Sequence, residues 1–232
     1  MRARVGVGIP SLESESTTMK RRSFLLSSLG LTAAFAAGTH VRAATSATDI
    51  IRVEEDWYIK VGDPDPDIDA PQIVTVFGPV NPITGTHAIF ELNHGTQPDF
   101  AQGGMQLQCW YANSLVGYRS QHAPAELNVV DEVIKFTTAS EIILTGTDRV
   151  LMEVIDGTST SWGTFGGTRS LRLSIPTSLD DLNSFDPAHS IANSRVTFGG
   201  NRVIVYKRTA IRYYDGAGLH QTDTTDTVVE AW

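Results

Sequence analysis

Apolar and polar residues alternate along most of the chain beyond residue 50, which is the pattern of strands that bury one face. In segment 105–111 the odd-numbered residues are apolar, whereas Gln106, Gln108 and Trp110 occupy the even-numbered positions. Successive side chains of a strand point to opposite sides of a sheet, so we expect the odd positions in the core and the even ones in water. Segments 86–93 and 169–175 alternate in the same way.

Short segments rich in Val, Ile, Thr, Tyr and Phe, bounded by Gly, Pro, Asn or Asp, follow one another through the chain. They predict strands at 50–61, 72–77, 86–93, 104–111, 114–119, 131–138, 140–145, 149–155, 169–175, 195–198 and 201–214, the last bent near Thr209. The pairs Asp156-Gly157 and Asp215-Gly216 and two Gly-Gly pairs offer the positive φ that tight hairpins require. No segment shows a convincing amphipathic helix. The pattern predicts an all-β protein, a two-sheet antiparallel β-sandwich of jelly-roll type.

The N-terminal region carries an export signal. Arg21 and Arg22 precede a Ser-Phe-Leu-Leu segment, a run of small and apolar residues at 27–38 and a cleavage-type triplet at 41–43. This order is typical of a bacterial twin-arginine signal, so we expect residues 1–43 to be removed and the protein to be periplasmic or extracellular. Met19 directly precedes the basic residues and is a candidate for the true start. The alternative is a membrane anchor, but the apolar run is shorter than the roughly 20 residues that cross a bilayer, so no membrane insertion is expected after cleavage.

Charge, length and cysteine content limit the possible partners and the number of domains. Removing residues 1–43 takes away six of the 18 basic residues and two of the 26 acidic ones, which leaves a net charge near −12. Nucleic-acid binding depends on clustered Lys and Arg, so we expect no nucleic-acid partner. Residues 44–232 have the length of one domain with a sizeable core. Cys109 is the single cysteine, so no disulfide can form within the chain.

The end of the chain resembles the final strands of concanavalin A-like lectin/glucanase jelly rolls. The likeness rests on the run from Arg195 to Arg202, on Tyr206 and on segment 211–214, together with the paired short strands and the size of the domain. The chain is also similar to uncharacterised bacterial β-proteins that carry twin-arginine signals. The resemblance implies a jelly-roll fold and a range of functions, from sugar binding to glycan cleavage and cell-surface adhesion.

The sequence lacks the common motifs of glycan-cleaving enzymes. Jelly-roll hydrolases place carboxylates on alternate residues of one strand, whereas Glu153 and Asp156 are three residues apart and point to opposite faces. We therefore expect Glu153 to be a solvated or hydrogen-bonded strand residue. Lyases need a base such as His or Tyr beside Arg or Gln, and four histidines occur in expected loops without a recognisable partner: His94, His122, His189 and His220.

An acidic segment after the first expected strand is a candidate calcium site. Asp63, Asp65, Asp67 and Asp69 lie within seven residues, and carboxylate oxygens are the ligands that Ca²⁺ prefers. The segment lacks the Gly and the terminal Glu of an EF-hand loop. The alternative is a proline-stiffened, solvated connection between two strands. Ca²⁺ is the only cofactor that the sequence suggests.

An exposed aromatic ring with planar amides beside it has the chemistry of a sugar-binding site. Trp110 with Gln106 and Gln108 supplies both on one strand face, and Trp162 and Phe165 are expected beside or above it. Core packing is the alternative for these aromatic residues. The leading hypothesis is an exported, non-enzymatic β-sandwich that binds carbohydrate or a cell-surface polymer. The alternatives are a glycan-cleaving enzyme with dispersed catalytic residues and a structural subunit of an envelope assembly.

Overall fold

The computed structural model describes residues 46–63, 70–78, 85–94, 104–121, 127, 129–143, 148–167 and 170–231. The expected signal with Arg21 and Arg22, three acidic residues of the candidate calcium segment (Asp65, Asp67 and Asp69) and His122 lie outside these ranges. No helix within them is long and apolar enough to cross a membrane.

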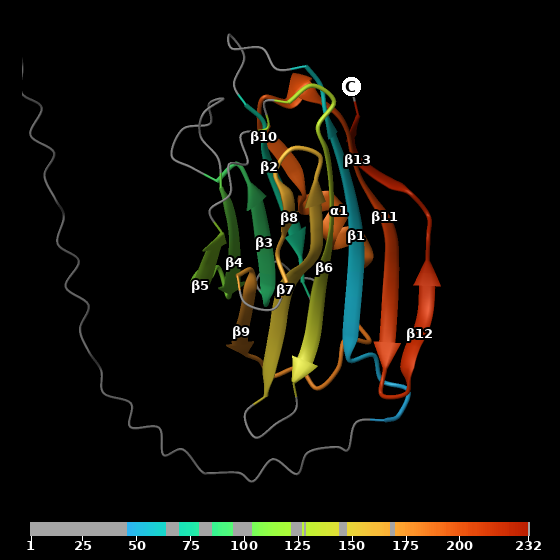
Figure 1. Cartoon of the computed structure of the whole chain (residues 1–232). Coiled ribbons are helices and arrows are strands. Elements are labelled where there is room, and N and C mark those ends of the chain that lie inside the picture. The colour runs from blue at the N-terminus through green and yellow to red at the C-terminus, as the bar shows by residue number, and fades with distance from the viewer. Residues whose placement is uncertain are drawn as a thin grey trace, which may run out of the picture. The chain divides into compact units, whose positions relative to one another are not determined.

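The strands form two antiparallel sheets, which Figure 1 shows as two layers. The eight-stranded sheet runs in the order β12 (Gly218–Asp223), β11 (Val203–Asp215), β1 (Arg52–Val61), β6 (Val133–Ile143), β7 (Arg149–Ser159) and β8 (Gly163–Phe165), with β13 (Thr227–Ala231) paired to β11 and β9 (Arg172–Pro176) paired to β7. The five-stranded sheet runs in the order β10 (Arg195–Phe198), β2 (Gln72–Phe77), β3 (His87–Leu92), β4 (Met105–Tyr111) and β5 (Ser114–Gln121). This architecture confirms the predicted all-β, two-sheet, single-domain fold.

The core lies between the inner faces of the two sheets. The Trp57 ring of the eight-stranded sheet stacks at 6.5 Å on Phe136 and lies 5.6 Å from Tyr206. Phe90 of the five-stranded sheet meets Phe136 edge to face at 5.0 Å, which joins the two layers. The buried Tyr206 hydroxyl lies 2.7 Å from the Thr75 hydroxyl, so the one polar atom of this ring is satisfied across the core.

Strand β4 follows the predicted alternation closely. Met105, Leu107 and Cys109 are at most 1% exposed and face the core, and the three even-numbered side chains lie on the outer face, half-buried. Tyr111 was expected to face inward but is 53% exposed, because it ends β4 at the turn of the β4–β5 hairpin. The alternation therefore orients the strand correctly except at its end.

Several boundaries differ from the sequence prediction. Two strands predicted within 131–145 form the single strand β6, whose residues Phe136–Ser140 are all buried, so burial of both faces hides the alternation there. Asp156-Gly157 is not a hairpin turn but a bulge within β7, where the pairing with β6 skips a residue. The predicted bend near Thr209 is confirmed as an irregularity in the β1–β11 register. Strands β8, β12 and β13 were not predicted, and β12 has no apolar pattern because all its residues are exposed.

A short helix, α1 (Pro187–Asn193), was also missed, and it contains His189, which was expected in a loop. Asp186 caps its N-terminus by accepting from the Ala188 N–H, and Pro187 occupies the first turn. Ser194, directly after the helix, accepts a hydrogen bond from the Val76 N–H at 2.9 Å. Ser194 thereby satisfies a backbone donor of β2 at Val76, which β10 does not pair.

Candidate ligand-binding face

The outer face of the five-stranded sheet brings nine side chains of three adjacent strands into a grid. The register of β3, β4 and β5 sets three rows across the strands. These rows are His87, Trp110 and Leu115, then Ile89, Gln108 and Tyr118, then Glu91, Gln106 and Ser120. We call this grid the Trp110 face. Directly paired side chains on one face of a sheet lie about 5 Å apart, so neighbours in a row are in contact distance.

A chain of hydrogen bonds runs through the Trp110 face. The Trp110 indole N–H donates to Gln108 Oε1 at 3.1 Å, and Gln108 Nε2 donates to Gln106 Oε1 at 2.8 Å and to Glu91 Oε2 at 3.2 Å. Gln106 Nε2 in turn donates to Ser120 Oγ at 3.1 Å. Gln108 thus uses both amide N–H groups on described residues, whereas Gln106 retains one, and both amide oxygens keep a lone pair for a further donor.

Aromatic side chains lie at two places on this face. The Trp110 indole is half-buried and stacks on the His87 imidazole, with centroids 6.4 Å apart and planes inclined by 10°. Tyr118 pairs with Gln108 and is 56% exposed. The two amide side chains are therefore flanked by aromatic surface that is at least partly open to solvent.

The structure moves the other two expected binding residues away from this face. Phe165 is only 5% exposed and packs in the core, 6.1 Å from Phe90 and 6.2 Å from Phe136. Trp162 is half-buried and packs on Phe165 at 5.4 Å. The expectation that both rings lie beside or above Trp110 is thus corrected, because β8 turns this aromatic pair inward against the sandwich core.

A small cavity adjoins the Trp110 face on the side of β2. It measures about 180 Å³ and lies between α1, β10 and the outer face of β2 and β3. Its lining consists of Val74, Val76, His87, Ile89, His189, Asn193 and Arg195. Burial lowers the pKa of both His87 and His189, so both imidazoles favour the neutral form. We call this the His189 cavity.

Sequence reasoning named His189 only as a loop histidine, and it missed both the cavity and the partner of His94. His94 was expected to be a lone loop histidine, but its Nδ1 lies 2.6 Å from Glu91 Oε2. A spacing of three residues would place the two side chains on opposite faces of a strand, but β3 ends at Leu92 and Asn93 has φ 57°, so the chain turns and brings His94 back to Glu91. No local sequence pattern indicates that His189 and Arg195 line a cavity with β2 and β3, since these segments are about a hundred residues apart in the chain.

The remaining expected site residues lie elsewhere. Asp63 is described, and its backbone oxygen accepts from Arg202 Nε at 3.3 Å. The described residues contain no group of three or more His, Cys, Asp or Glu that could hold a metal ion. Glu153 is 7% exposed and pairs with Arg52 at 3.3 Å and Arg172 at 3.4 Å, which agrees with a hydrogen-bonded structural role.

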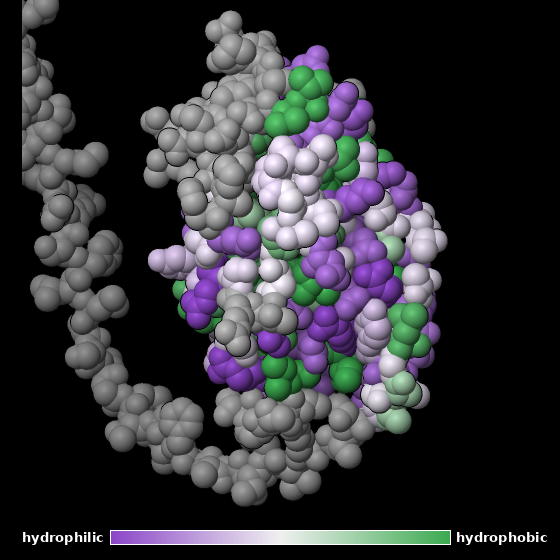
Figure 2. All heavy atoms as spheres, viewed as in Figure 1, coloured by the Kyte–Doolittle hydropathy of each residue, from purple (hydrophilic) through white to green (hydrophobic). Residues whose placement is uncertain are grey.

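Arg52 and Glu153 belong to a set of ion pairs on the outer face of the eight-stranded sheet. Arg212 contacts both Glu54 and Asp56, and Arg52 contacts Glu54, Glu141 and Glu153. Figure 2 shows hydrophilic residues gathered where Figure 1 places β1, β6 and β11. These charges satisfy one another, so this face offers less to a ligand than the Trp110 face does.

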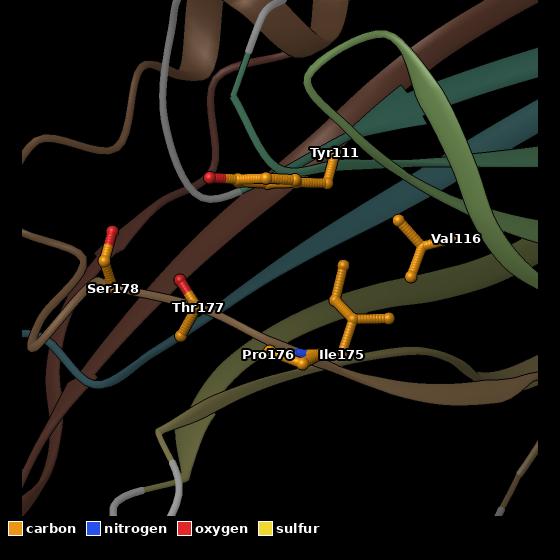
Figure 3. A pocket seen from close by; sticks show the side chains of 6 residues that line it. All are labelled: Tyr111, Val116, Ile175, Pro176, Thr177 and Ser178. Atoms are coloured by element: carbon orange, nitrogen blue, oxygen red, sulfur yellow. The ribbon is translucent and has the colours of Figure 1, made fainter. Parts of the chain in front are cut away.

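An apolar groove of about 370 Å³ opens beside the β4–β5 hairpin. Figure 3 shows Tyr111 across the groove from the segment Ile175–Ser178. Its walls are the Tyr111 ring, Val116, Ile175 and Pro176, and Thr177 and Ser178 add two hydroxyls at one end. The groove combines one aromatic ring with few polar groups, in contrast to the row of amides on the Trp110 face.

Comparison with known proteins finds no family model, no curated protein and no solved structure that matches this chain. The function therefore has to be inferred from the side chains themselves.

Proposed function

We propose that this chain is an exported, non-enzymatic β-sandwich that binds carbohydrate or a cell-surface polymer on the Trp110 face. The observation that supports it most is the chain of hydrogen bonds along β4 from Trp110 through Gln108 to Gln106, with the exposed Tyr118 beside Gln108. Aromatic faces pack against sugar C–H groups, and planar amides hydrogen-bond sugar hydroxyls. These hydrogen bonds hold the three side chains of β4 in place before a ligand binds, which lowers the entropic cost of binding.

The unused hydrogen-bond donors and acceptors of Gln106, Gln108 and Ser120 define the contacts that a sugar would make. Both glutamine oxygens and the Ser120 hydroxyl can accept from sugar hydroxyls, and the remaining N–H of Gln106 can donate. Among the described residues the face extends across three neighbouring strands, which suits a segment of a polymer better than a single small molecule. Export by the twin-arginine route would place the protein where such polymers occur; exchange of Arg21 and Arg22 for lysine should abolish export, as cell fractionation would show.

Binding is tested by a glycan array and by pull-down on insoluble polysaccharides, with the wild type and the variants Trp110→Ala and Tyr118→Ala. We expect each variant to weaken binding about fivefold to tenfold, because an aromatic contact of this kind contributes about 1 to 1.4 kcal/mol. Tyr111→Ala is the matched control, since Tyr111 is equally exposed but lies away from this face. Circular dichroism confirms folding of each variant. Absence of binding by the wild type, or equal binding by Trp110→Ala, would remove the proposal.

One contact favours the alternative of a glycan-cleaving enzyme. The Glu91 carboxylate and the His94 imidazole form a close pair next to Gln106 and Gln108, and such a pair can move a proton. Release of reducing ends, or ultraviolet absorbance of an unsaturated product, would reveal cleavage. Loss of that activity in Glu91→Gln would assign it to this pair.

A further inference from the structure

Provided that the Trp110 face binds glycan as proposed, we infer that its ligand is an acidic glycan, whose carboxylate or sulfate ester enters the His189 cavity. With about 180 Å³, the cavity has room for one small group and is smaller than sites that enclose a whole ligand. Its floor is apolar, formed by Val74, Val76 and Ile89, and its polar groups come from β3, β10 and α1. It is therefore suited to one polar substituent of a ligand whose remainder lies outside.

The charge of the cavity selects the sign of that substituent. Arg195 is exposed on β10 and forms no ion pair with another described residue. None of the described residues that line the cavity is acidic, and Asp186, which acts on His189 electrostatically, caps α1 by accepting from the Ala188 N–H. A guanidinium without a counter-charge at the mouth of a cavity is a ready partner for a carboxylate or a sulfate, to which it can donate two hydrogen bonds at once.

His189 adds a hydrogen-bond donor without an acceptor. Asn193 Nδ2 donates to the His189 backbone oxygen at 2.9 Å, which orients the amide, and lies 3.1 Å from His189 Nδ1. Nδ1 is therefore an acceptor, so the neutral imidazole carries its proton on Nε2. The side chain is 6% exposed, and Nε2 has no hydrogen-bond partner among the described residues. Buried N–H groups are rarely left unpaired, and because the Nε2 atom has almost no accessible surface, a ligand oxygen reaches it only after the imidazole turns toward the cavity.

The cavity is continuous with the Trp110 face. His87 lines the cavity and also stacks on the Trp110 indole. Ile89 of the cavity floor pairs directly with Gln108 across β3 and β4. A sugar that contacts Trp110 and Gln108 can therefore place an acidic substituent among His87, His189 and Arg195 without a long spacer.

Nearby acids are held by other partners. Glu91, on the same face of β3, accepts from Gln108 and pairs with His94, and Glu230 accepts from the Val196 N–H next to Arg195. The mature chain is strongly acidic as a whole, so it has no general attraction for polyanions. Selectivity for an acidic glycan must therefore arise locally, which makes a single-residue test decisive.

The test compares three ligands of matched length by isothermal titration calorimetry on the mature protein. These are an oligogalacturonate, its carboxyl-reduced neutral counterpart and a sulfated galacto-oligosaccharide. We expect at least one acidic ligand to bind ten times or more tightly than the neutral one, and the better of the two acidic ligands identifies the carboxylate or the sulfate as the group that is recognised. Arg195→Gln should reduce this preference about tenfold. Arg119→Gln, which removes an equal charge from β5 outside the cavity, should leave it unchanged.

Each outcome decides between the two proposals. Equal affinity for neutral and acidic ligands, or a preference that Arg195→Gln leaves intact, overturns the inference while binding at Trp110 stands. Binding of neutral glycans alone also overturns the inference and leaves the proposed binding at Trp110 in place. If no glycan binds, including those on the array, the proposed function fails and this inference with it.

Discussion

At the scale of single residues, Glu55 and Arg208 form a buried ion pair. Glu55 is 2% exposed, and its carboxylate accepts from Arg208 Nη1 at 2.8 Å and from the Ser190 hydroxyl at 3.0 Å. Arg208 Nη1 also donates to the Pro187 backbone oxygen at 2.7 Å. The pair therefore anchors α1, and with it His189, to the inner face of the eight-stranded sheet.

The ionisation of Glu55 makes stability depend on pH in a specific direction. Burial raises the pKa of Glu55 from 4.5 to about 7, although Arg208 and Ser190 both favour the carboxylate. A pKa raised by folding favours the folded state most below pH 4.5, and this contribution is lost as the pH rises to about 7. Neighbouring Glu54 and Asp56 have lowered pKa values and act in the opposite direction, so the total curve mixes both effects.

The variant Glu55→Gln isolates this contribution, because other groups cancel in the difference between the two proteins. From pH 4.5 to 7 we expect the wild type to lose up to about 3 kcal/mol of unfolding free energy relative to Glu55→Gln. Urea unfolding at four or five pH values measures the difference. Parallel stability curves for the two proteins would show that Glu55 titrates at its ordinary pKa in the fold.

At the scale of elements, the bulge at Asp156-Gly157 determines how β7 meets β8. Asp156 has φ 51°, and Gly157 pairs with Phe165 of β8. The Phe165 ring lies so close to Gly157 that a Cβ placed there would be 2.4 Å from its Cδ2 and Cε2 atoms. Glycine is required at this position because the ring fills the space of a side chain.

Gly157→Ala should therefore be destabilising. Relief of the clash would push Phe165 against Phe90 and Phe136, and such overpacking costs about 1 to 3 kcal/mol. Gly117→Ala on β5 is the control, since its Cβ would meet Leu173 at an ordinary 3.7 Å, and we expect a change within about 1 kcal/mol. Midpoints of urea unfolding measure both, and equal midpoints for the two variants would contradict the packing argument.

The whole molecule is an acidic sandwich without a disulfide, so its stability rests on the core and on any bound ion. The expected calcium site at Asp63, Asp65, Asp67 and Asp69 stays a prediction from the sequence, because three of the four residues lie outside the described ranges. Ion binding to the folded state alone would raise its unfolding free energy by mass action.

Addition of 5 mM calcium after treatment with EDTA should raise the melting temperature by about 3 to 6 °C. This estimate takes a dissociation constant of about 0.5 mM, typical of extracellular sites, which corresponds to about 1.4 kcal/mol. Magnesium at the same concentration is the control for ionic strength. Melting curves that coincide in EDTA and in calcium would leave the segment as a solvated connection.

The sequence by itself determined the fold class and the orientation of the central strands. The alternation at 105–111 placed Leu107 and Cys109 in the core and Gln108 and Trp110 on the outer face, because side-chain direction in a strand is a local property with a period of two. The sequence prediction was wrong at Asp156-Gly157, where residues typical of a hairpin turn form a bulge within β7. It also missed β12, because no face of this strand is buried and its residues do not alternate.

Only the tertiary structure decided which residues surround Trp110. It turned Phe165 into the core, and it brought His189 and Arg195 to β3 across about a hundred residues of chain. Such neighbours follow from strand order, from the register of β2 with β10 and from the anchoring of α1 by Glu55. These are contacts between distant segments, and no local pattern of hydrophobic and polar residues specifies them.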